Sequence, residues 1–113
     1  GDLESAILRA PTARMVLLHA GTVDILRYIE FCRANEHLLL DLSLTIMKYA
    51  GSSVDQDLSY ALNSFDRRIC VGTDYPWYSP ADLVERLSPM IRTLDPAKRN
   101  RILRGNIENY LTC

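Results

Sequence analysis

The sequence predicts an α/β fold in which short parallel strands alternate with helices. Three almost continuously apolar runs support this prediction: MVLLHAG (residues 15–21), HLLLDLS (37–43) and RICVGTD (68–74). Such runs are typical of strands covered on both faces, which is the condition of strands in a parallel sheet. The segments between the runs carry apolar residues at helical spacing. Repeated strand-then-helix units imply parallel strands joined by right-handed crossovers.

The first three helices are predicted from amphipathic faces and from residues that start or stop helices. The first helix ends at Pro11. Thr22 is the expected N-cap of the second helix, and Ser53 with Gln56 has the spacing of a capping box before the third. The residues expected to form the buried faces are Leu3, Ala6, Ile7 and Ala10, then Ile25, Leu26, Ile29 and Cys32, then Val54, Leu58, Ala61, Leu62 and Phe65.

Further helical segments are predicted after the third apolar run. Ser79-Pro80 opens a helix in which Pro89 should cause a kink or an early end. Asp95-Pro96 starts the next segment, and Gly105-Asn106 has the composition of a C-cap followed by a new N-cap. The apolar residues of these segments are Leu83, Val84, Leu87 and Ile91, then Ile102 and Leu103, then Ile107, Tyr110 and Leu111.

The composition narrows the class of protein and of partner. The chain has 113 residues, enough for one domain with a modest core, and 13 Lys and Arg against 14 Asp and Glu. This charge balance gives no reason to expect nucleic acid or a membrane as partner, and no apolar run is long enough to span a bilayer. The cysteines Cys32, Cys70 and Cys113 are odd in number and lack metal-type spacing, and the first two fit a core. We therefore expect a reduced, cytoplasmic protein.

The predicted sheet is too small to be complete. Three strands cannot close a barrel, and an open sheet of three such strands has two long apolar edges. We therefore expect the chain to be part of a larger domain, or to associate with another chain.

Candidate site residues follow the predicted strands. The first run ends in His19, the second in Asp41 and Ser43, and the third in Thr73 and Asp74. Ligands of parallel α/β folds bind beyond the carboxyl ends of the strands, so these side chains should converge on one rim. One imidazole with one or two carboxylates suits a divalent metal and general acid–base chemistry.

The alternation of side chains along a strand makes this prediction more specific. If His19 faces the site, Leu17 should share its side of the sheet, and Cys70 should share the side of Asp74.

Each candidate also has a structural interpretation. His19 could be a hydrogen-bonded residue at a strand end, and Asp74 before Tyr-Pro could cap its own turn. Asp41 and Ser43 could cap the loop that follows them, and Asn106 could cap a helix. The aromatic residues Tyr75, Trp77 and Tyr78 could line the mouth of a pocket or simply cover the sheet.

The ordered set MVLLHAG, LLLDLS, RICVGTDYPW and RILRGNIENYL resembles the C-terminal part of the amidohydrolase superfamily. The nearest branch is that of the amidohydrolase-related, predicted metal-dependent TIM-barrel hydrolases, which includes decarboxylases similar to aminocarboxymuconate semialdehyde decarboxylase. The resemblance implies a partial TIM (β/α)8 barrel. Residues 1–113 would be its C-terminal portion, with the three runs as the sixth, seventh and eighth strands.

The resemblance also implies roles for individual residues. His19 matches the histidine that ends the sixth strand and binds metal or contacts the reacting group. Asp74 matches the aspartate of the eighth strand, a metal ligand and often the base for the attacking water. The implied cofactor is a divalent metal, zinc in the first place, and the substrate-binding candidates are Ser43, Tyr75 and Trp77. Gly105-Asn106 matches a closing motif that we interpret as structural.

The chain departs from the family in its ligand set. The His-x-His pair of the first strand and the ligand of the fifth have no counterpart, and of the two histidines His37 lies at the wrong end of its run. A zinc site needs three or four protein ligands, so the isolated chain should bind metal weakly and turn over little.

Three functions stay open. The chain belongs to a metal-dependent hydrolase of amide, ester or similar carbonyl bonds, or to a decarboxylase of a small aromatic or unsaturated acid. Alternatively, it is a non-catalytic half-barrel that associates with itself. The expected partners are a small-molecule substrate and either the remainder of the barrel or a second copy. No glycine-rich loop follows the first run, which disfavours a nucleotide-binding domain.

Overall fold

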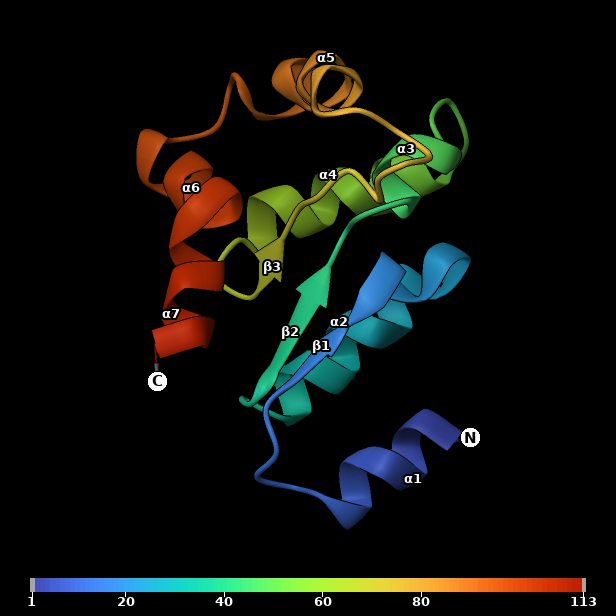
Figure 1. Ribbon diagram of the computed structural model, residues 1–113, viewed down its shortest axis with the longest axis vertical. Helices are drawn as coiled ribbons and strands as arrows, with labels where there is room; N and C mark the ends of the chain where they lie inside the picture. The colour runs from blue at the N-terminus through green and yellow to red at the C-terminus, as the bar shows by residue number, and fades with distance from the viewer. Residues whose placement is uncertain (1, 113) are drawn as a thin grey trace.

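The three apolar runs form a parallel sheet in chain order, β1-β2-β3, in the computed structural model, which describes residues 2–112 (Figure 1). The strands are β1 (Met15–Leu17), β2 (Leu38–Asp41) and β3 (Ile69–Cys70). The prediction of a mixed α/β fold with parallel strands is therefore confirmed, although each strand is shorter than its apolar run. The parallel pairing brings the carboxyl ends of all three strands to one edge of the sheet.

Seven α-helices surround the sheet in the described part of the chain. Their bounds are α1 (Asp2–Arg9), α2 (Ile25–Ala34), α3 (Thr45–Lys48), α4 (Val54–Ser64), α5 (Pro80–Ile91), α6 (Pro96–Asn100) and α7 (Asn106–Thr112). An irregular turn, Leu18–Asp24, joins β1 to α2, and a π-helical turn, Arg101–Gly105, joins α6 to α7. None of these helices has the length and apolar character needed to cross a bilayer.

The main core lies between the sheet and the helices behind it. Helices α2 and α4 cover one face of the sheet in Figure 1, and Leu38, Leu40 and Ile69 point into the layer between them. The buried helical residues that meet these strand residues include Ile25, Ile29, Cys32, Val54, Leu58, Ala61 and Leu62, as the helical spacing predicted. Several residues that the helical spacing placed on buried faces are exposed instead: Ala6, Leu26 and Val84.

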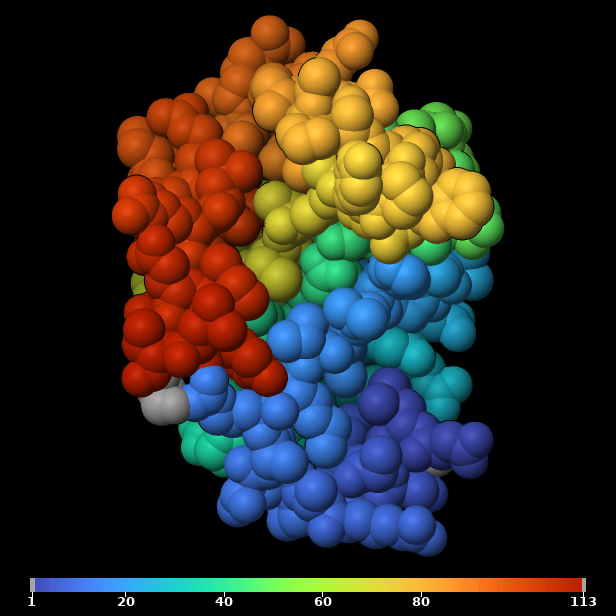
Figure 2. Space-filling view, in the orientation of Figure 1, coloured from blue at the N-terminus to red at the C-terminus, as the bar shows by residue number. Residues whose placement is uncertain are grey.

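The opposite face of the sheet has no helix across it within residues 2–112. Because side chains alternate along β2 and β3, this face carries Leu39, Asp41 and Cys70. Figure 2 shows atoms of the β2 and β3 segments between the blue first strand and the red C-terminal helices. At the amino-terminal edge, the Arg14 guanidinium lies 4.7 Å from the centre of the Tyr110 ring, so the chain before β1 contacts helix α7 there.

Two predicted helix starts are confirmed by their hydrogen bonds. The Ser79 hydroxyl accepts from the Asp82 N–H at 3.1 Å, and the Asp82 carboxylate accepts from the Ser79 N–H at 3.0 Å, which makes a capping box before α5. The Asp95 carboxylate accepts from the Ala97 N–H at 2.8 Å and caps α6.

Two further predicted N-caps are wrong. Thr22 lies inside the turn before α2 with φ 56°, and its hydroxyl donates to the Gly21 carbonyl rather than to the helix. Before α4, Ser53 makes no side-chain cap bond, and it is the Ser52 hydroxyl that accepts from the Val54 N–H. Pro89 does not end α5, which continues to Ile91.

Asn106 is not an N-cap either, because the chain stays helical through Gly105 and Asn106 itself has φ −64° and ψ −45°. Its side chain is buried and donates from Nδ2 to the carbonyls of Asp66 at 2.6 Å and Ile69 at 2.8 Å. The carbonyls of Arg68 and Cys70 accept from β2, so that of Ile69 points to the other side of β3, where α7 presents Asn106. Asn106 is therefore structural, as expected, but it connects α7 to the outer edge of β3.

Candidate functional site

His19 and Asp74 meet at the carboxyl edge of the sheet, on either side of the end of β2. The two atoms His19 Nε2 and Asp74 Oδ1 lie 3.3 Å apart, a distance at which the ring N–H can donate to the carboxylate. Both side chains are partly exposed, 34% for His19 and 26% for Asp74. The pair therefore has the convergence that the sequence predicted, and solvent can reach it.

A left-handed turn, not the alternation of a strand, brings His19 to this position. Strand β1 ends at Leu17, and residues 19–22 all have positive φ, with His19 at 61° and Gly21 at 70°. Leu17 packs in the core against the helices, whereas Cys70 lies on the opposite face of the sheet. The alternation on which the pairing of His19 with Leu17 was predicted therefore ends at Leu17, because the left-handed turn interrupts the strand there.

Gly21 explains why this turn can form. A side chain at this position would place a Cβ 2.5 Å from Cδ1 of Tyr28, at a φ of +70° that side chains disfavour. The turn packs directly on α2 here, and glycine meets both requirements at once.

Positive φ values recur in the segments that follow the other two strands. Leu44, after β2, has φ 64°, and Asp74, after β3, has φ 59°. Conformations of this kind cost residues other than glycine about 1–3 kcal/mol each and are concentrated at functional sites. Together with His19, these residues place a left-handed backbone conformation beyond the end of every strand.

Asp41, Ser43 and Cys70 form a buried polar cluster on the face of the sheet opposite α2 and α4. The Ser43 hydroxyl donates to Asp41 Oδ1 at 2.6 Å, the Ser43 N–H donates to the same oxygen at 3.2 Å, and Cys70 Sγ lies 3.9 Å from it. Burial, reinforced by the neighbouring Asp41 carboxylate, raises the pKa of the Cys70 thiol to about 12. The Ser43 hydroxyl hydrogen is thus directed at Asp41, inside the protein, rather than at solvent.

Both described cysteines are free and buried, as the apolar pattern predicted, and Cys113 lies outside the described residues. Burial raises the pKa of the Cys32 thiol to about 11. Neither thiol has the exposure and the lowered pKa of a nucleophile.

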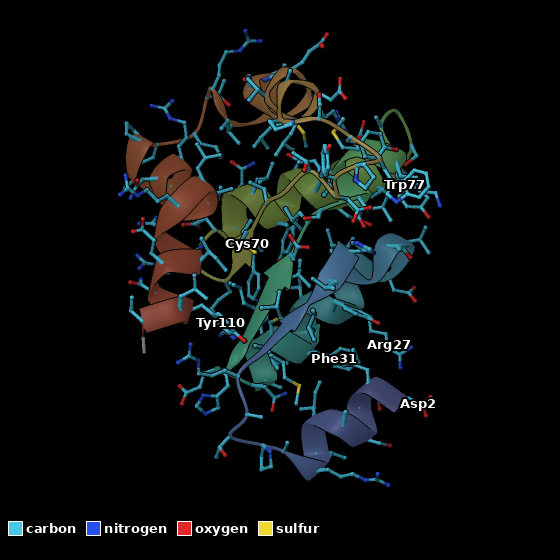
Figure 3. The ribbon with its side chains drawn as sticks, in the orientation of Figure 1. Asp2, Arg27, Phe31, Cys70, Trp77 and Tyr110 are labelled. Carbon is cyan, nitrogen blue, oxygen red and sulfur yellow. The ribbon has the colours of Figure 1, made fainter. Side chains whose placement is uncertain are left out.

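Tyr75 and Trp77 project into solvent beside Asp74. Their side chains are 79% and 78% exposed, and Figure 3 shows Trp77 at the outer rim of this edge. The turn that presents them is fixed by two backbone donors: the Tyr75 N–H donates to the Thr73 hydroxyl and the Trp77 N–H to the Asp74 carbonyl. Because they are so exposed, these two aromatic residues do not cover the sheet.

Thr45 belongs to the site but was not predicted. It is fully buried at the start of α3, and its hydroxyl donates to the main-chain carbonyl of His19. The two residues are 26 positions apart, and no local pattern in the sequence connects them.

The donor atoms of the pair fit a divalent metal in chemistry and spacing but not in number. Two ligands of a tetrahedral zinc ion, each about 2.0–2.1 Å from it, lie roughly 3.3 Å from each other, which is close to the His19–Asp74 separation. Within residues 2–112, no group of three or more His, Cys, Asp and Glu side chains is arranged to hold a metal ion. His37 lies beside Glu36 at the opposite edge of the sheet. A metal site here would need further ligands from outside residues 2–112.

No family model matches this chain, and no curated protein matches it either.

Proposed function

We propose that this chain is the C-terminal portion of a metal-dependent hydrolase with a TIM-barrel fold, and that His19 and Asp74 are two ligands of its metal. The single observation that carries the proposal is the 3.3 Å approach of His19 Nε2 to Asp74 Oδ1 at neighbouring strand ends. This edge is where parallel α/β folds bind their substrates, and the approach matches the spacing of two ligands on one cation.

The two residues have different roles in this proposal. A divalent metal, zinc in the first place, supplies a Lewis acid that polarises a carbonyl and lowers the pKa of bound water. The Asp74 carboxylate is accessible to water and accepts the proton that the attacking water loses. The His19 imidazole would hold the metal through its unprotonated Nε2, beside the Asp74 carboxylate.

The exposed aromatic residues supply the substrate side of the proposal. Tyr75 directly follows Asp74 and Trp77 is three residues from it, and both rings are free to contact the apolar part of a small molecule. Ser43, the third substrate-binding candidate, fits less well because its hydroxyl already donates to Asp41. We assign Ser43 to the support of the site.

Within residues 2–112 no helix crosses the face of the sheet that carries Leu39, Asp41 and Cys70, and these side chains are buried within the chain, at 4–7% exposed. In the proposed barrel this face would line the inside, so the remainder of the barrel is the partner that we propose for it. A second copy of the chain is the alternative occupant. The free, buried thiols suit the reducing cytoplasm in which we place the protein.

Zinc titration of the 113-residue chain tests whether the pair binds metal. Wild type should bind zinc weakly by calorimetry, and His19→Gln and Asp74→Asn should each lower the affinity at least ~10-fold, or about 1.4 kcal/mol. His37→Gln is the matched control, because it removes the only other histidine and should leave the affinity unchanged. Equal affinities for all four proteins would contradict the proposal.

In the complete enzyme, Asp74→Asn should abolish turnover. The product then identifies the reaction: carbon dioxide released from a small unsaturated or aromatic acid would establish decarboxylation, and cleavage of an amide or ester would establish hydrolysis. Full activity of Asp74→Asn would remove Asp74 from either mechanism.

A further inference from the structure

The loop after β2 contacts both segments that carry the candidate pair. On one side, the buried Thr45 hydroxyl donates to the carbonyl of His19. On the other side, the Ser43 hydroxyl oxygen packs against Gly72, so closely that a Cβ on Gly72 would lie 2.7 Å from it. Residues 41–45 run from the end of β2 to the start of α3, and we call them the loop 41–45. This loop therefore lies between the turn that presents His19 and the segment that presents Asp74.

The contact with His19 has a specific structural purpose. Since β1 ends at Leu17, the His19 carbonyl has no partner in the sheet, and its φ of 61° turns it away from the strand direction. A buried carbonyl or hydroxyl without a hydrogen bond costs about 1–3 kcal/mol. Thr45, with no exposed surface, satisfies both groups with one bond.

The same bond restrains the backbone from which the imidazole projects. The His19 carbonyl is held by Thr45, and the His19 ring lies within hydrogen-bond distance of Asp74. The other end of the loop is held in turn, because Asp41 accepts two hydrogen bonds from Ser43.

From these contacts we infer that Thr45 is a positioning residue for the His19–Asp74 pair. It touches neither functional atom and acts through the His19 main chain. The inference rests on the proposed function only for the chemical role of the pair. The hydrogen bonds and packing contacts behind it do not involve a metal.

A double-mutant comparison by NMR tests this inference without metal or substrate. The probe is the Cε1–H signal of His19, with that of His37 as the internal reference. Asp74→Asn should shift the His19 signal in wild type and in Thr45→Ser, which keeps the hydroxyl donor. In Thr45→Val, which keeps the shape and loses the donor, most of this response should disappear. The His37 signal should not move in any variant.

The outcome also distinguishes positioning from plain stability. If Thr45→Val is less stable but its His19 signal responds to Asp74→Asn as in wild type, Thr45 is structural only and the inference is overturned. If Thr45→Val does not fold, the exchange rate of the Thr45 hydroxyl proton with water, measured in the wild-type protein, tests the inference instead. Slow exchange with a cross-peak to His19 supports the bond, and rapid exchange overturns it. Failure of zinc binding in the earlier titration would remove the proposed function and leave this test unaffected.

Discussion

The two edges of the sheet use their polar side chains in opposite ways. At the amino edge, Asn106 and Arg68 donate to main-chain carbonyls: Asn106 to those of Asp66 and Ile69, and Arg68 to those of Leu38 and Asn35. At the carboxyl edge, His19 and Asp74 face each other and solvent, on backbone with positive φ. The first arrangement satisfies main-chain carbonyls, and the second leaves an imidazole and a carboxylate accessible to solvent.

Under the proposed function, this difference separates the edge that stabilises the fold from the edge that binds metal and substrate. The amino edge is further fixed by Asp66, whose carboxylate pairs with Arg101 at 2.7 Å and lies 4.0 Å from Lys98. The carboxyl edge instead carries backbone strain, exposed aromatic rings and an accessible pair. Mutations at the amino edge should therefore affect mainly folding, and those at the carboxyl edge mainly binding.

Among substitutions at the two edges, the largest effect on stability should come from Asn106→Ala at the amino edge. It leaves two carbonyls, those of Asp66 and Ile69, without the donor that Asn106 supplies, and should lower the free energy of unfolding by about 2–4 kcal/mol in urea denaturation. Asn109→Ala, an exposed position one turn later in α7, is the control and should change stability by less than about 0.5 kcal/mol. Similar losses in both variants would show that the amino edge has no special role.

A smaller effect is expected from Gly72→Ala, which can be compared with Gly105→Ala, next to Asn106. Gly72→Ala would force a Cβ against the Ser43 hydroxyl and should cost about 1–3 kcal/mol in the same urea assay. The control is Gly105→Ala in the π-helical turn, where the nearest atoms lie 3.7 Å away. That variant should gain roughly 0.5–1 kcal/mol, since alanine suits a helix better than glycine. A neutral Gly72→Ala would mean that the loop 41–45 is not tightly packed.

The smallest effect should come from Trp77→Ala at the carboxyl edge. With 78% of the side chain exposed, its removal should change the free energy of unfolding by less than about 0.5 kcal/mol, measured as above. The matched buried position is Leu62 in α4, where Leu62→Ala should cost about 2–5 kcal/mol. A loss above 1 kcal/mol for Trp77→Ala would show that this ring is packed and would weaken its assignment to substrate binding.

The features that the sequence predicted are those with a local cause. Apolar runs located the strands, and the spacing of Leu58 and Leu62 located the buried face of α4. The capping box of Ser79 and Asp82 lies within four residues and was partly anticipated through Ser79-Pro80. The convergence of His19 with Asp74 followed from the rule that parallel strands end at one edge.

The features that escaped prediction depend on residues far apart in the chain. Asn106 has the composition of a cap, but its partners Asp66 and Ile69 lie 40 and 37 positions earlier. No local sequence pattern marks Thr45, because the His19 carbonyl to which its hydroxyl donates lies 26 positions earlier. The short strand β1 could not be foreseen either, because an apolar run does not reveal where a left-handed turn interrupts it.

The left-handed conformations at positions 19 and 74 have a consequence for how this edge changes by mutation. Apart from glycine, residues such as Asn, Asp and His enter this region of backbone space most often, and β-branched residues are the least suited to it. Under the proposed function, histidine and aspartate thus meet a chemical and a conformational requirement together. Descendant sequences that lose the chemistry should drift first to asparagine or glycine at these two positions, and reversal to the ancestral pair would then need few changes.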